Sequence, residues 1–220
     1  MTQQIDLALA RIKPHMTVSI GGGNHMKHLA DAIHAADVPD LTLTTPSEET
    51  ADYARQLGLT ITDHPASINL AFDGCDSADL HGNLLKSNGA IFTYEKRNAM
   101  LADQVVILAP ASKLQDKLDN TVPLTVELLE AAEPLVRQLA DNYQLTVSKR
   151  AAGNYMGFTR TRDGNVLIDL LGQDWHDLAT IDAALSRLPG VVATSFFNRL
   201  ADVIITENTD GTAQVMRKED

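Results

Sequence analysis

The stretch 70–96, LAFDGCDSADLHGNLLKSNGAIFTYEK, runs from an apolar segment into two aspartates, crosses a polar loop with a lysine, and ends near a glutamate. Its apolar start, INLAFDG (68–74), is typical of a buried strand. AIFTYEKRNAMLA (90–102) has the pattern of a helix that follows the loop 82–89. We therefore expect a strand, a loop and a helix, with charged residues at the junctions.

Strands and helices alternate on both sides of this stretch. MTVSIGGGNHMKHLADAIHAA (16–36) predicts a strand, a glycine turn and a helix. LTLTTPSEETADYARQLGL (41–59) repeats that plan, with Ser47 placed to cap the helix. DQVVILAPASKLQDKL (103–118) supplies a fourth strand and a loop that carries Lys113. This alternation predicts an α/β fold with a Rossmann-like, mostly parallel sheet covered on both faces.

The pattern changes near Pro123. Residues 123–199 predict the order β-α-β-β-α-β, with a hairpin at 162–165 and a long helix that ends before Pro189, which is a ferredoxin-like α+β unit. ADVIITENTDGTAQVMRK (201–218) then predicts two strands that return to the first sheet.

The small domain is therefore expected to be an insertion. The predicted division is a catalytic domain of residues 1–122 plus 200–220 and a small ferredoxin-like domain of residues 123–199.

Composition excludes several classes of protein. The formal charge of −11 disfavours nonspecific binding to nucleic acid, because such binders usually carry basic patches. No run approaches the roughly 18 to 20 apolar residues of a membrane span, and the first residues lack a signal-peptide pattern, so a cytoplasmic protein is expected. Cys75, the single cysteine, cannot form an internal disulfide, and its acidic neighbours disfavour a nucleophilic thiolate.

Four charged residues of the opening stretch point to chemistry as a group. Taken singly, Asp73 and Asp76 can be turn formers, Lys86 a surface lysine and Glu95 an ordinary helix acid. Because ligands of open parallel sheets bind at the carboxyl ends of the strands, we expect these residues to meet there. A site for acid/base chemistry on a sugar needs carboxylates that bind hydroxyls, a cation that stabilises oxyanion charge, and a carboxylate that moves a proton. These residue types are all present in the stretch.

The glycine turn at 21–23 is a weaker signal. Backbone N–H groups of such a turn, before a helix, can bind an anion, but the same turn can be a tight connection without a ligand. The spacing does not match G-x-G-x-x-G, because Met26 stands three positions after Gly23, and this disfavours a nucleotide.

Several ordered motifs resemble those of the type A ribose-5-phosphate isomerase family. That family carries D-G-A-D-E, K-G-G-G and R-E-K, and this chain has DGCDS (73–77), KSNG (86–89) and YEK (94–96) at the same spacing. ILAPASKLQDKL (107–118) is similar to the family's A-D-x-S-K segment, and VPLTVELLEAA (122–132) to P-L-P-V-E-V. The resemblance covers nearly all of the chain.

The resemblance implies a role for each residue. Glu95 would shuttle a proton between C2 and C1 of the open-chain sugar through a cis-enediolate, and Lys86 would stabilise the oxyanion. Asp73 and Asp76 would contact hydroxyls and assist ring opening, and Lys113 would bind substrate. No metal or organic cofactor is implied, the ligand is a small sugar phosphate, and a homodimer is expected.

The phosphate loop departs from the family. Where the family writes G-T-G-S-T, this chain has GGGNH (21–25), so the hydroxyls that would hold phosphate are missing. The expected substrate contacts, beside Lys113, are Gly22, Gly23, Asn24, His25, Ser87, Asn88 and Gly89.

This rewritten loop leaves two alternatives to a ribose-5-phosphate isomerase of the pentose phosphate pathway. One is a non-catalytic sugar-phosphate binding or regulatory module on the same fold. The other is an isomerase of a different sugar.

Overall fold

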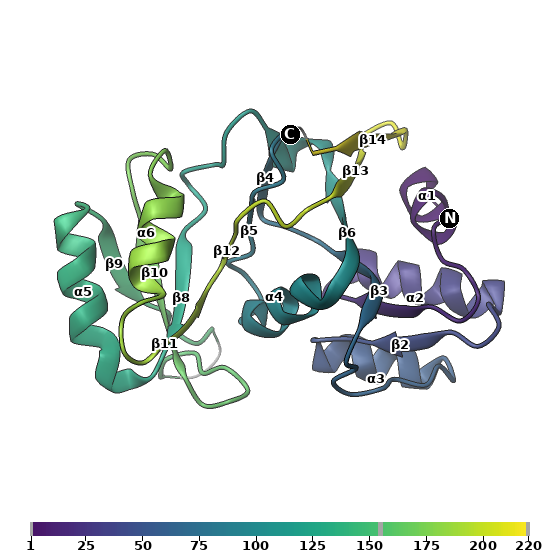
Figure 1. The fold of residues 1–220 in the computed structure, drawn as a ribbon, viewed down its shortest axis with the longest axis horizontal. Coiled ribbons are helices and arrows are strands. Elements are labelled where there is room, and N and C mark those ends of the chain that lie inside the picture. Colours follow the sequence, from purple (N-terminus) through teal and green to yellow (C-terminus); the bar gives the residue numbers. More distant parts are fainter. Residues whose placement is uncertain (1, 154–155, 219–220) are drawn as a thin grey trace.

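The computed structural model describes residues 2–153 and 156–218, and its largest sheet has six strands (Figure 1). The order across this sheet is β14 (Ala213–Arg217), β13 (Val203–Glu207), β6 (Ala102–Pro110), β3 (Ile68–Asp73), β1 (Thr17–Ile20) and β2 (Thr42–Thr44). Neighbouring strands are parallel except for the β13–β14 pair. The predicted mostly parallel α/β sheet is confirmed, and the two C-terminal strands do return to it.

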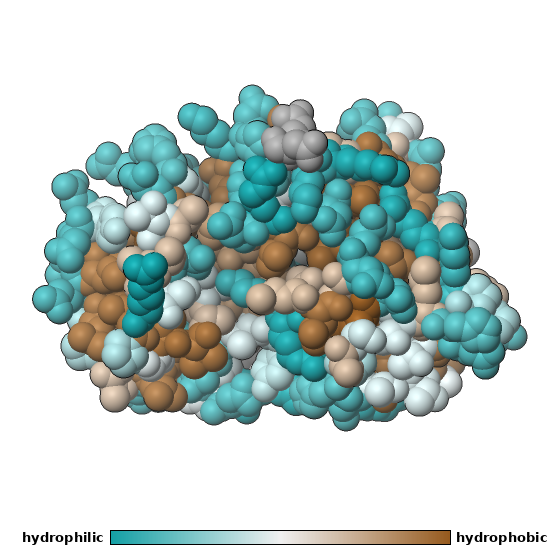
Figure 2. Space-filling view, in the orientation of Figure 1, coloured by the Kyte–Doolittle hydropathy of each residue, from teal (hydrophilic) through white to brown (hydrophobic). Residues whose placement is uncertain are grey.

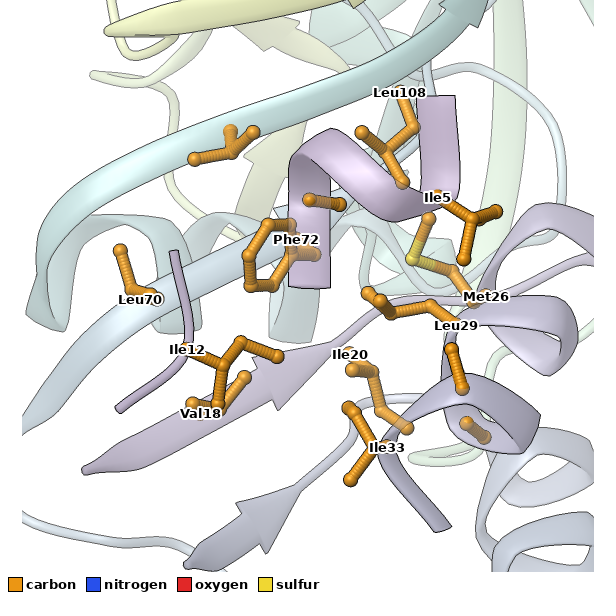
Figure 3. Packing of buried hydrophobic residues seen from close by; sticks show 14 of the residues in the cluster. Ile5, Ile12, Val18, Ile20, Met26, Leu29, Ile33, Leu70, Phe72 and Leu108 are labelled. Atoms are coloured by element: carbon orange, nitrogen blue, oxygen red, sulfur yellow. The ribbon is translucent and has the colours of Figure 1, made fainter. Parts of the chain in front are cut away.

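Helices cover both faces of this sheet because its strands bury alternate residues on opposite sides. The helices that belong to it are α1 (Gln3–Leu9), α2 (Asn24–Ala36), α3 (Glu48–Gln56) and α4 (Phe92–Leu101). In β6, Val106 and Leu108 pack in the core shared with α1 and α2, whereas Val105 and Ile107 pack in the core that contains Phe92 of α4. Figure 3 shows Leu108 in the first of these cores. Burial on both faces explains why β3 and β6 appear in the sequence as continuous apolar runs.

A separate sheet of four antiparallel strands forms the other end of the molecule (Figure 1). Its order is β11 (Val191–Thr194), β8 (Leu124–Leu128), β10 (Val166–Leu171) and β9 (Thr146–Lys149). With α5 (Glu133–Asn142) after β8 and α6 (Leu178–Leu185) after β10, this is the expected ferredoxin-like arrangement. The prediction of a long second helix is wrong: α6 has eight residues, because the chain turns at Ser186–Leu188 before Pro189.

A third sheet was not predicted. It consists of β12 (Phe196–Phe197), β5 (Leu84–Leu85), β4 (Ser77–Asp79) and β7 (Leu114–Gln115). Its strands have two or three residues each, too short to give a period in the sequence, and the region 82–89 therefore resembled a plain loop. This sheet pairs β12, from the predicted small domain, with β5 from the predicted large one, while the other two sheets stay within the predicted boundaries. The domain division itself stays a prediction.

Hydrophilic and apolar residues are unevenly distributed over the surface (Figure 2). The face shown in Figure 2 is hydrophilic around most of its edge, with apolar residues gathered over its left part and centre. Among residues 2–153 and 156–218, no helix is both long enough and apolar enough to cross a membrane.

Candidate active site

A cavity of about 710 Å³ opens between the carboxyl ends of β1 and β3 and the segment 160–162, which lies between β9 and β10. Its volume is within the usual range for small-molecule sites. Its lining consists of residues 22–23, 46–49, 73–76, 88–91 and 160–162 together with Lys86 and Glu95. The predicted acid/base group therefore shares one cavity with two of the glycines.

The centre of the cavity is a cluster of two carboxylates around one ammonium group. Lys86 Nζ lies 3.0 Å from Asp73 Oδ1 and 3.2 Å from Glu95 Oε1, and it donates a hydrogen bond of 2.7 Å to the carbonyl oxygen of Gly74. Asp73 ends β3, Lys86 follows β5 and Glu95 stands in the first turn of α4. All three side chains are buried, so their charges interact in a low-dielectric environment.

This arrangement shifts the pKa values of the cluster in a useful direction. Burial, followed by the charge of Asp73, raises the pKa of Glu95 to about 8, although Lys86 opposes the shift. Burial alone would lower the pKa of Lys86, but the carboxylates of Asp73 and Glu95 outweigh it and raise that pKa. Glu95 Oε2 is buried and has no hydrogen-bond partner among the described residues. The geometry thus leaves one oxygen of the Glu95 carboxyl group, whose pKa is raised to about 8, free to take up a proton.

Gly21 is required by the position of Asp73. A Cβ atom at residue 21 would lie 2.1 Å from Asp73 Oδ1, so any side chain there would displace the carboxylate. The first glycine of the turn therefore makes room for the acid cluster, whether or not the turn binds an anion.

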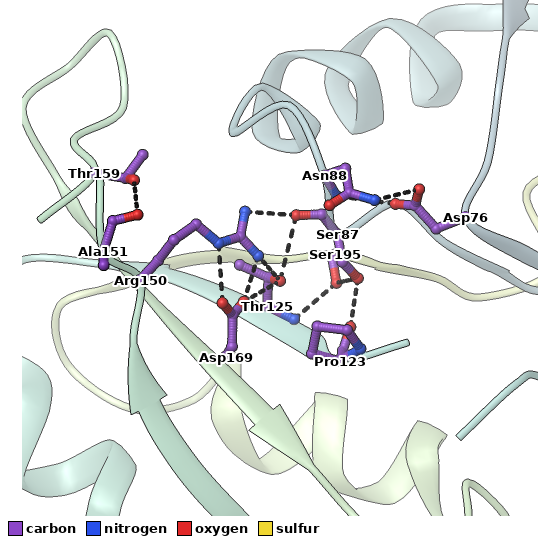
Figure 4. Close-up of polar contacts among 10 residues, drawn as sticks. All are labelled: Asp76, Ser87, Asn88, Pro123, Thr125, Arg150, Ala151, Thr159, Asp169 and Ser195. Carbon is purple, nitrogen blue, oxygen red and sulfur yellow. Dashed lines mark hydrogen bonds and ion pairs between the residues drawn. The ribbon is translucent and has the colours of Figure 1, made fainter. Parts of the chain in front are cut away.

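Asp76 organises the loop that follows Lys86. Its carboxylate accepts hydrogen bonds from the backbone N–H of Asn88 (2.9 Å) and from the Asn88 side-chain amide (2.7 Å; Figure 4). Lys113, in the short 3-10 helix η1 (Ala111–Lys113), places its Nζ 3.8 Å from Asp76 Oδ1. Asp76 and Asn88 line the cavity, and Lys113 stands behind Asp76 rather than in the lining.

Residues of the antiparallel sheet β11-β8-β10-β9 and of its connections also bind this loop (Figure 4). Lys86 donates its backbone N–H to Ser195 (2.9 Å), and the Ser87 hydroxyl bonds to the carbonyl of Pro123 and lies 3.0 Å from Ser195 Oγ. Arg150 donates a 2.7 Å hydrogen bond to the carbonyl oxygen of Ser87.

The guanidinium group of Arg150 is itself fixed by side chains of β10 and β8 in the antiparallel sheet. It pairs with both carboxylate oxygens of Asp169 and donates to the Thr125 hydroxyl at 2.8 Å. Residues far apart in the sequence therefore set the position of the loop that carries Lys86.

Arg150→Met is expected to lower the free energy of unfolding by about 2–4 kcal/mol, because it leaves the Asp169 carboxylate and the Ser87 carbonyl without their donor. Urea unfolding would measure this change. Arg137→Met is the matched control: Arg137 forms an exposed i,i+4 pair with Glu133, and its loss should cost less than about 0.5 kcal/mol. Equal effects of the two substitutions would contradict the role of Arg150.

The predicted substrate-binding residues separate into two groups. Gly22, Gly23, Asn88 and Gly89 line the cavity. The other group does not belong to the lining and consists of Asn24, His25, Ser87 and Lys113. Their substrate contacts stay predictions.

Sequence reasoning missed two contributors to the cavity. One is the start of α3, where Ser47 caps the helix by accepting from the Thr50 N–H and Glu48 and Glu49 extend the lining. The other is the hairpin segment 160–162, which brings two arginines. The sequence signalled the hairpin turn but gave no sign that it faces Glu95, because about 65 residues separate them along the chain.

Two further observations concern the cysteine and possible metal ligands. Burial raises the pKa of the Cys75 thiol to about 12, in line with the expectation that it is not a nucleophile. Among residues 2–153 and 156–218, no group of three His, Cys, Asp or Glu side chains is arranged to hold a metal ion.

Comparison with known proteins shows what the sequence is similar to. The sequence model of the family described as ribose 5-phosphate isomerase A (phosphoriboisomerase A) matches residues 42–211. The ribose-5-phosphate isomerase A of Thermosynechococcus vestitus is 30% identical over 98% of this chain and 94% of that protein. That of Thermococcus kodakarensis is 27% identical over 96% of this chain and 94% of that protein.

Solved structures agree on the fold. A D-ribose-5-phosphate isomerase in complex with phospho-erythronic acid has a TM-score of 0.90 and 24% identity, covering 98% of this chain and 96% of that one. The ribose 5-phosphate isomerase of Plasmodium falciparum has a TM-score of 0.88 and 24% identity, covering 99% and 98%. The family model matches most of the chain, the relatives match over nearly their full length, and the sequence motifs agree with both. The chain therefore belongs to the ribose 5-phosphate isomerase A family.

Proposed function

We propose that this protein interconverts D-ribose 5-phosphate and D-ribulose 5-phosphate through a cis-enediolate, in the non-oxidative branch of the pentose phosphate pathway. The observation that carries the proposal is the buried Glu95 carboxylate, which has one oxygen 3.2 Å from Lys86 Nζ and the other without a partner, beside a cavity. Family membership supports the substrate class.

Each residue of the cluster has a part in this reaction. The free oxygen of Glu95 removes the proton from C2 of the open-chain aldose and returns it to C1. Negative charge then develops on the sugar oxygens, and the buried ammonium group of Lys86 stabilises it. Asp73 keeps Lys86 in place, and Asp73 and Asp76 offer acceptors to the sugar hydroxyls during ring opening. The proton of the C2 hydroxyl also passes to O1 in the enediolate, so the aldose and the ketose have the same composition and the carboxylate of Glu95 is regenerated.

The phosphate group is assigned to the glycine turn. Among the residues that the structure describes, no side chain caps the first turn of α2, whose N-cap Gly23 has a positive φ of 92°. The backbone N–H groups there are suited to an anion, and the helix dipole adds favourable potential. Asn24 and His25 begin α2 and stand nearest to this turn. Lys27, one turn further, is already paired with Glu49 at 3.4 Å.

A discontinuous ketose assay with ribose 5-phosphate tests the proposal, with Glu133→Gln as a surface control in α5 and Glu95→Gln as the inactive variant. Turnover that depends on Glu95 supports it. Stabilisation by ribose 5-phosphate in a thermal-shift measurement without turnover would instead favour the non-catalytic module. Absence of both effects would favour a different sugar.

The pH dependence of kcat/KM follows from the raised pKa of Glu95. The base must be ionised in the free enzyme, so kcat/KM should rise with pH, close to tenfold per unit, and level off above about pH 8. The second ionisation of a phosphate monoester is near pH 6, so it would give a separate and lower inflection. A profile measured from pH 5.5 to 9.5 would show this limb, and a flat profile through pH 8 would contradict the role of Glu95.

A cytoplasmic location and a homodimer also belong to this proposal. Size-exclusion chromatography with light scattering would measure the mass of the assembly in solution.

A further inference from the structure

The cavity is acidic for a site that is assigned to a sugar phosphate. Five carboxylates and three cationic side chains line it. A phosphate monoester brings between one and two further negative charges near pH 7. Binding it therefore calls for a cation in the lining whose charge is not already matched by a protein carboxylate.

Two of the three cations are matched. Lys86 is held between Asp73 and Glu95, and Arg160 Nη2 lies 2.9 Å from Glu130 Oε2. Arg162, the third, is exposed and has no ion pair with a carboxylate in the part of the chain that the structure describes. Its guanidinium carbon lies 4.6 Å from the centre of the Tyr94 ring.

That stacked position suits an anion-binding role. A guanidinium group that rests one face on an aromatic ring keeps its in-plane N–H groups available, and these match the geometry of phosphate oxygens. Gly22 of the phosphate turn is adjacent to the same helix, since a Cβ there would lie 3.2 Å from the Ile91 side chain, at the N-cap of α4. Arg162 and Gly22 therefore both lie near the start of α4, where they contact Tyr94 and Ile91 respectively.

The hairpin that carries Arg162 is fixed to α4 by two ties. Tyr94 donates its hydroxyl to both carboxylate oxygens of Asp163, at 3.0 and 2.8 Å. Buried Glu127 of β8 accepts from the hydroxyl of Thr161 (2.8 Å) and from the hydroxyl of Thr93, which stands in the first turn of α4. The hairpin is therefore held at a defined place beside Glu95.

We propose that Arg162 binds the phosphate group of the sugar substrate and so determines specificity for phosphorylated sugars, with Tyr94 as a positioning residue that holds its guanidinium group. This inference rests on the proposed function. In this proposal Arg162, from the hairpin between β9 and β10, takes the place of the hydroxyl groups that the loop 22–25 lacks.

Arg162→Met is expected to raise KM for ribose 5-phosphate by about 10- to 100-fold while kcat changes less than about threefold. The inhibition constant of inorganic phosphate should rise in parallel, and Arg162→Lys should recover part of both losses. Arg187→Met, which removes an exposed arginine after α6, is the matched control and should leave both constants unchanged. Equal constants for the Arg162 and Arg187 variants would overturn the proposal.

Tyr94 has its own test. Tyr94→Leu removes both the ring under the guanidinium group and the hydroxyl that donates to Asp163, and it should raise KM several-fold. Tyr94→Phe keeps the ring and loses only the hydroxyl, so its KM should rise less. A raised KM in Tyr94→Phe equal to that of Tyr94→Leu would contradict the stacking role.

Calorimetric titration with inorganic phosphate separates this inference from the proposed function. If the unmodified protein does not turn over ribose 5-phosphate, the proposed function fails, but the phosphate site can still be measured. Binding at least tenfold weaker in Arg162→Met than in Arg187→Met would support the arginine as the phosphate ligand. Equal binding in the two variants, or no binding to the unmodified protein, would overturn it.

Discussion

Glu95→Gln is expected to lower kcat for ribose 5-phosphate by about 10²- to 10⁴-fold while KM changes little, because it removes the proton carrier but keeps the shape of the side chain. The amide cannot accept the C2 proton through Oε2, the oxygen that has no partner among the described residues. The ionising limb of kcat/KM near pH 8 should disappear from any residual activity.

The fold should survive this substitution. The amide keeps the size of the side chain, and burial and the charge of Asp73 already disfavour the ionised form of Glu95 and raise its pKa, so loss of the negative charge should cost little stability. Thermal unfolding and steady-state kinetics, compared with Glu133→Gln, would measure the two effects separately. Activity within tenfold of the unmodified protein, with the pH limb intact, would exclude Glu95 as the base.

Lys86→Met is expected to lower kcat by about 10²- to 10³-fold, because the developing oxyanion loses its buried cation. The carboxylates of Asp73 and Glu95 would then face each other without the ammonium group that lies between them at 3.0 and 3.2 Å. The pKa of Glu95 should rise further, and the kinetic limb should move above pH 8.

Lys96→Met is a demanding control for this substitution. Both lysines lie near the ring of Phe197, with Nζ at 5.9 Å for Lys86 and 5.4 Å for Lys96, but only Lys86 lines the cavity. A comparable loss of kcat in both variants would show that packing at Phe197, and not the charge at the substrate, explains the effect.

The cluster of acids illustrates how far a sequence can lead. INLAFDG (68–74) identified the strand that ends in Asp73, and the helical pattern of 90–102 placed Glu95 near a helix start. The rule that ligands bind at the carboxyl ends of parallel strands then brought these residues to one edge. The burial of Lys86 and the free oxygen of Glu95 did not follow from any of these patterns, because both depend on what packs around them.

The short third sheet and the hairpin show the opposite case. β4, β5, β7 and β12 are too short to leave a periodic signal, yet they fix the backbone on either side of Lys86. Arg162 gave no signal either, since its neighbour in space, Tyr94, lies 68 positions earlier in the chain.

The sequence by itself determined the α/β class, the ferredoxin-like segment and the family, and it predicted the acid/base residues, because these depend on local periodicity and on motifs of fixed spacing. Only the tertiary structure decided which side chains share the cavity, how burial moves the pKa of Glu95, and which cation of the cavity lining has no ion pair among the described residues. Burial and pairing are properties of segments brought together from distant parts of the chain, and no local pattern of residues encodes the distance between them.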